Sequence, residues 1–188
     1  MEYPLNTLGL AHKFIAEHIS PGDFCIDATA GKGRDTAFLC SLVGPDGRVL
    51  AMDIQPQAVS STKQLIDSLG FSDIVRVVLD SHENMENYAD ENSADGIMFN
   101  LGWLPGGDHN IFSKPDTTIK AINSALRILK PGGVMTICIY FGRECGYDER
   151  DRLLEFFPTI DQKKYTVIVS QFVNRRGDVP IPVFILKN

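Results

Sequence analysis

Short hydrophobic runs alternate along the chain with segments in which hydrophobic residues recur every three or four positions. Continuous runs are typical of buried strands, and the wider spacing is typical of amphipathic helices. Strands are expected at about 24–28, 48–53, 74–79, 94–100 and 134–140. Helices are expected at about 7–19, 34–43, 56–70, 116–129 and 148–157.

This alternation of strands and helices predicts a mostly parallel sheet with helices on both faces, because parallel neighbours need crossover connections. The last two expected strands, at about 165–173 and 181–186, lie too close in sequence for a crossover helix. They are therefore predicted to pair antiparallel. Five parallel strands and this hairpin give an α/β fold with a seven-stranded sheet.

The composition is that of a globular protein, with 44% hydrophobic and 22% charged residues. At 188 residues the chain is expected to form one domain over residues 1–188. We expect no signal peptide and no membrane association, since no apolar run is long enough to span a bilayer. The cysteines lack the paired spacing of disulfides or metal sites, so a cytoplasmic protein without a metal is expected.

The clearest chemical signal lies at 24–36, where a hydrophobic run ends in Asp27 and a loop of small residues leads into a helix. Gly31 and Gly33 allow a sharp turn and the close approach of a ligand to the backbone. The start of the helix directs unpaired N–H groups and the positive end of its dipole toward the same loop. This corner is expected to bind a small molecule with a carboxylate, a phosphate or ribose hydroxyls.

The spacing of the glycines narrows the choice of ligand. The third glycine of a dinucleotide-binding Gly-x-Gly-x-x-Gly motif is missing, and no Gly-Lys-Ser/Thr follows, which excludes a P-loop. Asp53 ends the second strand, where an acidic residue binds a ribose diol. A nucleoside without a pyrophosphate, S-adenosylmethionine, is favoured. The alternative is an ordinary strand–turn–helix corner without a ligand.

Charge is distributed unevenly along a chain whose net charge is −6. Residues 1–100 hold 6 Lys and Arg against 15 Asp and Glu, whereas residues 101–188 hold 12 against 9. The acidic half contains the expected cofactor loop, and the mildly basic half is compatible with a face that binds phosphates, with Arg175 and Arg176 as candidates.

Five motifs follow one another in order and carry a family resemblance. They are Asp-Ala-Thr-Ala-Gly-Lys-Gly-Arg-Asp-Thr at 27–36, Asp-Ile-Gln at 53–55, Asp-Ser-His-Glu-Asn at 80–84, Asn-Leu-Gly-Trp-Leu-Pro-Gly-Gly-Asp at 100–108 and Lys-Pro-Asp-Thr-Thr at 114–118. Over essentially the whole chain, the order of elements resembles the Rossmann-like class I S-adenosylmethionine-dependent methyltransferases. The motifs resemble the family named putative rRNA methylase. Its characterised members are similar to bacterial tRNA 5-aminomethyluridine methyltransferases, which methylate the amine of the modified wobble uridine.

Two segments depart from the pattern of that family. Residues 140–149 read Tyr-Phe-Gly-Arg-Glu-Cys-Gly-Tyr-Asp-Glu, so that Arg143 stands where the family usually has histidine. Residues 174–180 read Asn-Arg-Arg-Gly-Asp-Val-Pro, where an Asn/Pro-rich stretch is usual. Both segments are expected to face the substrate, so the departures bear on the acceptor rather than on the cofactor.

The resemblance implies a set of cofactor-binding residues at the ends of the first three strands. Asp35 suits the ammonium group of the methionine part, and Lys32 suits its carboxylate. Asp53 and Gln55 are expected at the ribose, with Ser81 and His82 at the adenine. The whole set is Asp27, Ala28, Thr29, Gly31, Lys32, Asp35, Thr36, Asp53, Gln55, Ser81 and His82.

Asn100 and Trp103 are the predicted catalytic residues. Methyl transfer to an amine is an in-line displacement that needs a neutral amine about 3 Å from the methyl group. Asn100 and the backbone after it can orient the lone pair of the amine, and Trp103 can hold a planar base. The arrangement is similar to the Asn-Pro-Pro-Tyr motif of amine-directed base methyltransferases. Further substrate-side candidates are Asp108, Tyr140 and Arg143, whereas His12, His18 and His109 show no spacing that suggests a partner.

Three functions are compatible with these observations. The favoured one is methylation of the aminomethyl nitrogen of 5-aminomethyluridine in tRNA, with the anticodon region as the partner. The second is methylation of another RNA base or of a small amine, which the acidic net charge keeps open. The third is a non-catalytic RNA-binding protein, and the residues Asp27, Gly31, Asp53 and Asn100 speak against it. Whether the protein forms a homodimer is left open.

Overall fold

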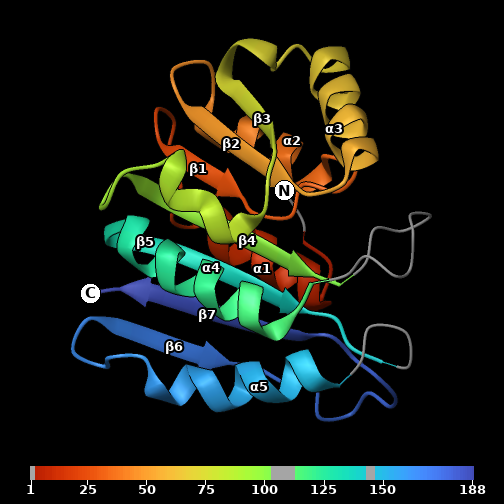
Figure 1. The fold of residues 1–188 in the computed structure, drawn as a ribbon, viewed down its shortest axis with the longest axis vertical. Coiled ribbons are helices and arrows are strands. Elements are labelled where there is room, and N and C mark those ends of the chain that lie inside the picture. The colour runs from red at the N-terminus through yellow and green to blue at the C-terminus, as the bar shows by residue number, and fades with distance from the viewer. Residues whose placement is uncertain (1–2, 103–112, 143–146) are drawn as a thin grey trace.

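The computed structural model describes residues 3–102, 113–142 and 147–188 (Figure 1). Its strands are β1 (Phe24–Asp27), β2 (Arg48–Asp53), β3 (Val75–Leu79), β4 (Ala94–Leu101), β5 (Leu129–Ile139), β6 (Tyr165–Val169) and β7 (Ile181–Lys187). The α-helices are α1 (Thr7–Ala16), α2 (Arg34–Val43), α3 (Pro56–Ser68), α4 (Pro115–Ile128) and α5 (Asp148–Phe156). Short 3-10 helices are η1 (Ser72–Ile74), η2 (His82–Asn87) and η3 (Phe157–Thr159).

The described strands form one sheet in the order β3-β2-β1-β4-β5-β7-β6. Neighbours from β3 to β5 are parallel, whereas β7 pairs antiparallel with both β5 and β6. This order confirms the predicted seven-stranded α/β fold with an antiparallel C-terminal pair. The strand order reverses between β1 and β4, and ligands of open α/β sheets bind outside the carboxyl ends of the strands at such a point.

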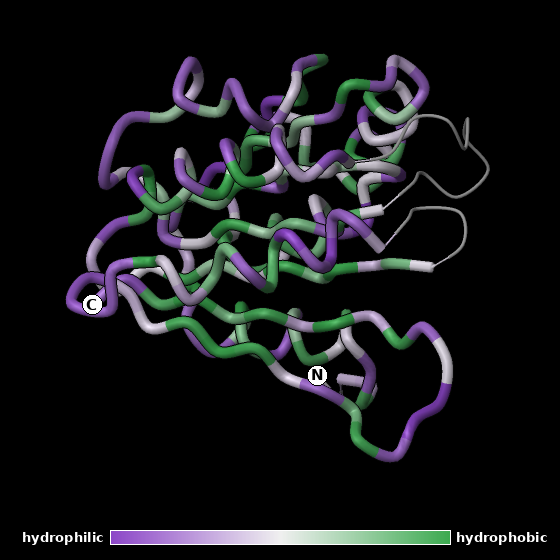
Figure 2. The backbone as a smooth tube through the Cα atoms, turned by 60° about the horizontal axis from the view of Figure 1, so that its bottom comes forward, coloured by the Kyte–Doolittle hydropathy of each residue, from purple (hydrophilic) through white to green (hydrophobic). Residues whose placement is uncertain are grey.

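Helices cover both faces of the sheet (Figure 1). On one face α1, α2 and α3 pack against the strands, with Ile15, Leu39 and Ile66 fully or almost fully buried. On the other face lie α4 and α5, where Ile122 and Leu153 belong to a second buried cluster. Figure 2 shows the consequence, with hydrophobic strand centres and hydrophilic connecting turns. Of the helices that the structure describes, none combines the length and apolar character needed to cross a membrane.

Local sequence signals account for most helix boundaries. The side chain of Asn6 caps α1 by accepting from the backbone N–H of Gly9 at 2.8 Å. Pro56 and Pro115 open α3 and α4, where the missing N–H of proline costs no helical hydrogen bond. Gly70 follows α3 with φ of +74°, which is typical of a glycine after a helix end.

Three expected boundaries are wrong. The first helix ends at Ala16 rather than near Ile19, although Ile19 is buried against the sheet and would meet a Cβ at Gly96. The helix expected to include Leu129 ends at Ile128, and Leu129 already pairs with Ala94 as the first residue of β5. The strand expected to reach residue 173 ends at Val169.

Tertiary contacts explain the early start of β5. The ammonium group of Lys130 lies 2.8 Å from both carboxylate oxygens of Asp95, which holds residues 130–133 beside β4. The register between the two strands shifts here, between the pairs formed by Ala94 and Gly96, and Gly132 has φ of +80°. The expected Lys-Pro-Gly-Gly turn is therefore an irregular part of a strand. In β6 the pairing ends because the chain turns away after Ser170, whose N–H bonds to Pro182.

Candidate functional site

The candidate site lies at the carboxyl ends of β1, β2 and β4, where the strand order reverses. Parallel pairing aligns these strands, with Asp27 opposite Ala51 in β2 and Met98 in β4. As a result, Asp27, Asp53 and Asn100 come to one edge of the sheet although they are distant in sequence. This edge is the one that the sequence predicts.

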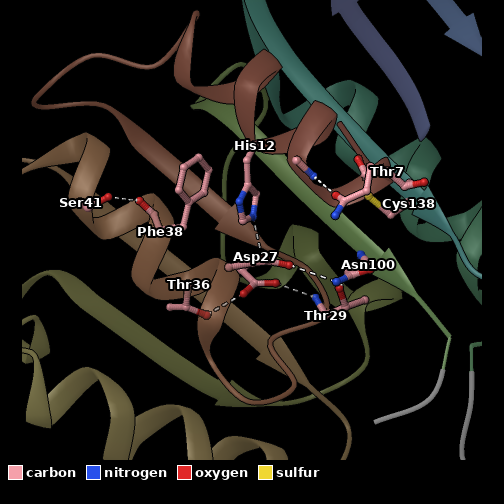
Figure 3. A network of polar contacts seen from close by, with 12 residues as sticks. Thr7, His12, Asp27, Thr29, Thr36, Phe38, Ser41, Asn100 and Cys138 are labelled. Atoms are coloured by element: carbon pink, nitrogen blue, oxygen red, sulfur yellow. Dashed lines mark hydrogen bonds and ion pairs between the residues drawn. The ribbon is translucent and has the colours of Figure 1, made fainter. Parts of the chain in front are cut away.

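Asp27 organises the start of the loop after β1 (Figure 3). Its carboxylate accepts from the hydroxyl of Thr36 at 2.6 Å and from the N–H of Thr29 at 3.2 Å. The side chain is fully buried, and this burial, with the nearby charge of Asp35, raises its pKa to about 7. Asp27 thus holds the loop to the first turn of α2. Ala28, equally buried, is tied to β4 by its N–H, which donates to the carbonyl of Met98.

Asp53 holds the glycine loop from the end of β2. One carboxylate oxygen accepts from the N–H of Gly31 and the other from the N–H of Gln55, each at 2.9 Å. Burial raises the pKa of Asp53 above its ordinary range, against the effect of these hydrogen bonds. Each carboxylate oxygen has two lone pairs, so both retain the capacity to accept from a ribose diol.

Gly33 lets the loop pass closely over α3. Its φ of +78° lies in the left-handed region, and a Cβ there would come within 2.9 Å of the Cα of Thr62. The hydroxyl of Thr62 in turn donates to the carbonyl of Gly31 at 3.3 Å. The loop 30–33 therefore needs glycine for its shape, and it presents its backbone at the N-terminus of α2.

Asn100 is fixed on both its backbone and its side chain. Its N–H donates to the hydroxyl of Thr29 at 2.7 Å, and its side-chain Nδ2 donates to Asp35 at 3.2 Å. The side-chain oxygen Oδ1 is buried and has no hydrogen-bond partner among the residues that the structure describes. A buried acceptor without a partner costs free energy, so Oδ1 of Asn100 is a candidate position for a hydrogen-bond donor of a ligand.

The end of β3 brings two further predicted residues to this edge. Ser81 caps η2, and its hydroxyl accepts from the N–H of Glu83. His82 packs edge-on against Phe99, and burial lowers its pKa while a hydrogen bond with the Ala28 backbone acts in the opposite direction. Asp80, one residue before them, was not among the predicted site residues. It accepts from Ser81, Asn84 and Tyr88, at 2.7 to 2.8 Å.

The remaining predicted residues differ in how far the structure describes them. Lys32 is exposed at the mouth of the loop. Tyr140 follows β5 beside Gly102, and burial together with the charge of Cys138 and Asp35 raises its pKa to about 12. Trp103, Asp108 and Arg143 lie outside the described residues.

Besides Asp80, sequence reasoning missed two polar residues near this edge. His12 has no spacing signal toward Asp35, yet its Nε2 lies 2.7 Å from the Asp35 carboxylate. Glu149, at the end of the predicted family pattern, accepts from the hydroxyls of Ser113 and Thr118 at 2.5 and 2.6 Å. Asp80 could have been found from the sequence, because an acidic residue stands at or directly after the end of each of the first three strands. No sequence pattern links His12 to the site.

Comparisons with known proteins place this chain among methyltransferases. Residues 49–186 match the model of the family described as "Putative rRNA methylase". A chloroplastic tRNA (mnm(5)s(2)U34)-methyltransferase of Arabidopsis thaliana is 35% identical over 95% of this chain, which spans 68% of that protein. A putative rRNA-methylase from Clostridium thermocellum has a structure with a TM-score of 0.96 at 42% identity, with both chains covered completely. A putative methyltransferase from Streptococcus mutans, in complex with SAH, has a TM-score of 0.88 at 33% identity over 98% of this chain and 99% of that one.

Fold, site and relatives together define a class I methyltransferase that uses S-adenosylmethionine. The described residues fit this cofactor, because both carboxylate oxygens of Asp53 retain acceptor capacity at the position predicted for the ribose, and the loop 30–33 presents its backbone at the N-terminus of α2. Within this class, the chain belongs to the putative rRNA methylase family.

Proposed function

We propose that this enzyme methylates the aminomethyl nitrogen of 5-aminomethyluridine at the wobble position of tRNA, giving 5-methylaminomethyluridine. The observation that carries the proposal is the buried Oδ1 of Asn100, which has no partner among the described residues and is aimed by the contact between Nδ2 and Asp35. An acceptor of this kind suits an N–H donor such as an amine. The name of the Arabidopsis relative, which refers to a modified U34 of tRNA, supports the choice of acceptor.

S-adenosylmethionine supplies a methyl group bonded to a positively charged sulfur. Asn100 accepts a hydrogen bond from the neutral amine through Oδ1, which turns the nitrogen lone pair toward that methyl group. The lone pair forms the new N–C bond while the electron pair of the breaking C–S bond passes to sulfur. The methylated amine then carries the positive charge and releases a proton to water.

The protein supplies orientation rather than acid–base chemistry in this scheme. Thr29 and Asp35 hold Asn100 from the backbone and from the side chain, so the acceptor oxygen does not have to reorganise when the amine arrives. Trp103 is proposed to hold the uracil ring by stacking, as the sequence predicts. Asp108, Tyr140 and Arg143 are proposed to contact the RNA.

Nucleoside mass spectrometry tests the proposal directly. The purified protein and S-adenosylmethionine are incubated with tRNA from a strain that lacks this enzyme, and the nucleosides are then analysed. We expect 5-aminomethyluridine to decrease as its N-methyl form appears. Asn100→Ala is expected to lower kcat about 100-fold or more. Asn123→Ala, in which an amide on α4 that bonds to Ile119 is removed, serves as the control.

A second candidate, methylation of a base in rRNA, is favoured by the description of the family. The same assay on ribosomal RNA distinguishes the two acceptors. Methyl incorporation into rRNA with none into tRNA would exclude the wobble assignment and leave the methyltransferase assignment in place. Turnover of small free amines without RNA would exclude both RNA acceptors.

A further inference from the structure

His12 of α1 lies against the predicted cofactor loop, although nothing in the sequence links the two. Its Nε2 is 2.7 Å from Oδ1 of Asp35, the second residue of α2. The imidazole ring also stacks on Phe38 of the same helix, with a centroid distance of 4.0 Å and an angle of 14° between the rings (Figure 3). Both its position and its ring plane are therefore fixed by α2.

The Asp35 carboxylate connects His12 to Asn100. Oδ1 faces His12, and Oδ2 accepts from the Nδ2 of Asn100 at 3.2 Å. The carboxylate is almost fully buried, with a side-chain exposure of 8%, so its rotation is restricted by the packing around it. Because one oxygen of the Asp35 carboxylate contacts the His12 imidazole and the other contacts the Asn100 amide, a displacement of the imidazole would also displace the amide.

This connection decides which way the Asn100 amide points. The Asp35 carboxylate only accepts hydrogen bonds, so it selects the NH2 end of the amide and turns Oδ1 away from itself. Without a fixed Asp35, the amide would be free to exchange its two ends. The buried Oδ1 would then lose the orientation on which the proposed chemistry depends.

A purely stabilising ion pair is the simpler explanation for the contact. His12 is 20% exposed and Asp35 only 8%, so the pair is largely buried, and the cost of removing its charges from water offsets much of its attraction. Asp35 also lies near Asp27, whose pKa its charge helps to raise. A second buried carboxylate beside the first is costly, and the contacts of Asp35 with both His12 and Asn100 point to a positional role.

We propose that His12 is a positioning residue that acts through Asp35 to orient the Asn100 amide toward the acceptor nitrogen. The inference rests on the proposed function, in which Asn100 receives the amine.

The inference is tested by comparing His12→Ala with His12→Gln, since glutamine can return an N–H donor to Asp35. We expect His12→Ala to lower kcat about 10- to 100-fold, because loss of orientation is costly when reactants must be aligned. The KM for S-adenosylmethionine and the affinity for SAH by calorimetry are expected to change less than about 3-fold. His12→Gln is expected to recover most of kcat. His18→Ala, just after α1, is the matched control, because the imidazole of His18 is exposed and its described hydrogen bond goes to the carbonyl of Phe14 in the same segment.

Two outcomes of the kinetics would overturn the inference. One is an unchanged kcat in His12→Ala. The other is an equal loss of kcat in His12→Ala and His12→Gln while both retain the melting temperature of the parent, since a restored donor would then have no effect.

Crystal structures of the same variants separate this inference from the proposed function. In His12→Ala we expect the hydrogen bond between Asp35 and Nδ2 of Asn100 to be broken or displaced, and in His12→Gln we expect it to be kept. An intact hydrogen bond in His12→Ala contradicts the inference even if the acceptor proves to be another amine. Failure of the parent enzyme to methylate tRNA contradicts the proposed function. The crystal structures still test the role of His12 in that case, because they do not depend on the acceptor.

Discussion

Carboxyl groups at the strand ends define the electrostatics of the site at the scale of single residues. Asp27 is fully buried with a pKa raised to about 7, and burial also raises the pKa of Asp53. Asp80, in contrast, has a lowered pKa because Asn84, Tyr88 and Ser81 donate to it. Perturbed carboxyl groups of this kind concentrate at functional sites, and they make stability depend on pH.

Replacement of Asp27 by asparagine is expected to flatten the pH dependence of stability. The folded state binds a proton at Asp27 more tightly than the unfolded state, whose pKa is about 3.9. The free energy of unfolding therefore contains a contribution that is present at low pH and is lost as the pH rises to about 7. The new amide would still accept from Thr29 and could donate to the hydroxyl of Thr36. Urea unfolding at pH 5 and at pH 8 measures the free energy of unfolding of the parent and of Asp27→Asn. An equal change in this free energy between the two pH values in both proteins would contradict the prediction.

Asp53→Ala is expected to weaken cofactor binding. The change removes the acceptor for the N–H of Gly31 and the predicted acceptor for the ribose diol. Hydrogen bonds to charged groups are worth about 1.5–3 kcal/mol, which corresponds to a rise in Kd of about 10- to 100-fold. Calorimetry measures the Kd for SAH. Asp73→Ala, which removes an exposed carboxylate in η1, is the control. An unchanged Kd would remove Asp53 from the binding site.

At the scale of elements, β4, α4 and α5 meet at a cluster of hydrogen bonds. Gly102, just after β4, donates its N–H to the hydroxyl of Ser113, just before α4, at 3.2 Å. Ser113 in turn donates to Glu149 of α5, as does Thr118. Glu149 is 4% exposed, and burial raises its pKa above the ordinary range. One carboxylate thus fixes the two chain positions that flank the predicted substrate segment.

Glu149→Ala is expected to destabilise the fold by about 2–3 kcal/mol, because the buried hydroxyl of Thr118 and the half-buried hydroxyl of Ser113 lose their acceptor. A decrease of kcat is expected with it, since Gly102 lies two residues after Asn100. Chemical unfolding and nucleoside formation measure the two effects, and Glu155→Ala, exposed on the same helix, is the control. A stability equal to that of the control would contradict the role given to Glu149.

At the scale of the whole molecule, the two halves of the sheet carry different kinds of side chain at the edge where the strands β1 to β5 end. The predicted cofactor residues lie at the ends of β1, β2 and β3, whereas a surface groove of about 380 Å³ lies on the α5 and β7 side. Arg150 and Arg175 line it, and each guanidinium lies over an aromatic ring, at 4.7 Å from Phe141 and 4.0 Å from Phe172. Such a groove suits the backbone of an RNA strand that leaves the site away from the cofactor.

The double variant Arg150→Ala, Arg175→Ala is expected to raise the KM for tRNA about 10-fold or more at physiological salt. The salt dependence of tRNA binding is expected to become shallower by about one unit of log–log slope for each phosphate that is no longer bound. Affinity for SAH is expected to stay the same. Lys63→Ala, exposed on α3, is the control for loss of surface charge. Equal KM values for the double variant and the control would exclude this route for the RNA.

Most of the architecture could be predicted from the chain, because its signals are local. A buried strand needs a hydrophobic run, and a helix needs apolar residues at its own period, so both can be recognised within about ten residues. The errors arose where a distant contact prevailed over local preference. Lys130 pairs with Asp95, 35 positions away. Residues 130–133, which were predicted to form a turn, therefore belong to β5.

The sequence by itself determined the α/β class, because the hydrophobic periods that indicate strands and helices are local, and it predicted a nucleoside cofactor from the loop after Asp27 and from Asp53. Only the tertiary structure decided which polar groups share the site. His12 and Asn100 lie 23 and 65 positions from Asp35, and they meet on its carboxylate because α1, α2 and β4 pack together. Contacts of this range depend on how helices lie against a sheet, which no local pattern specifies.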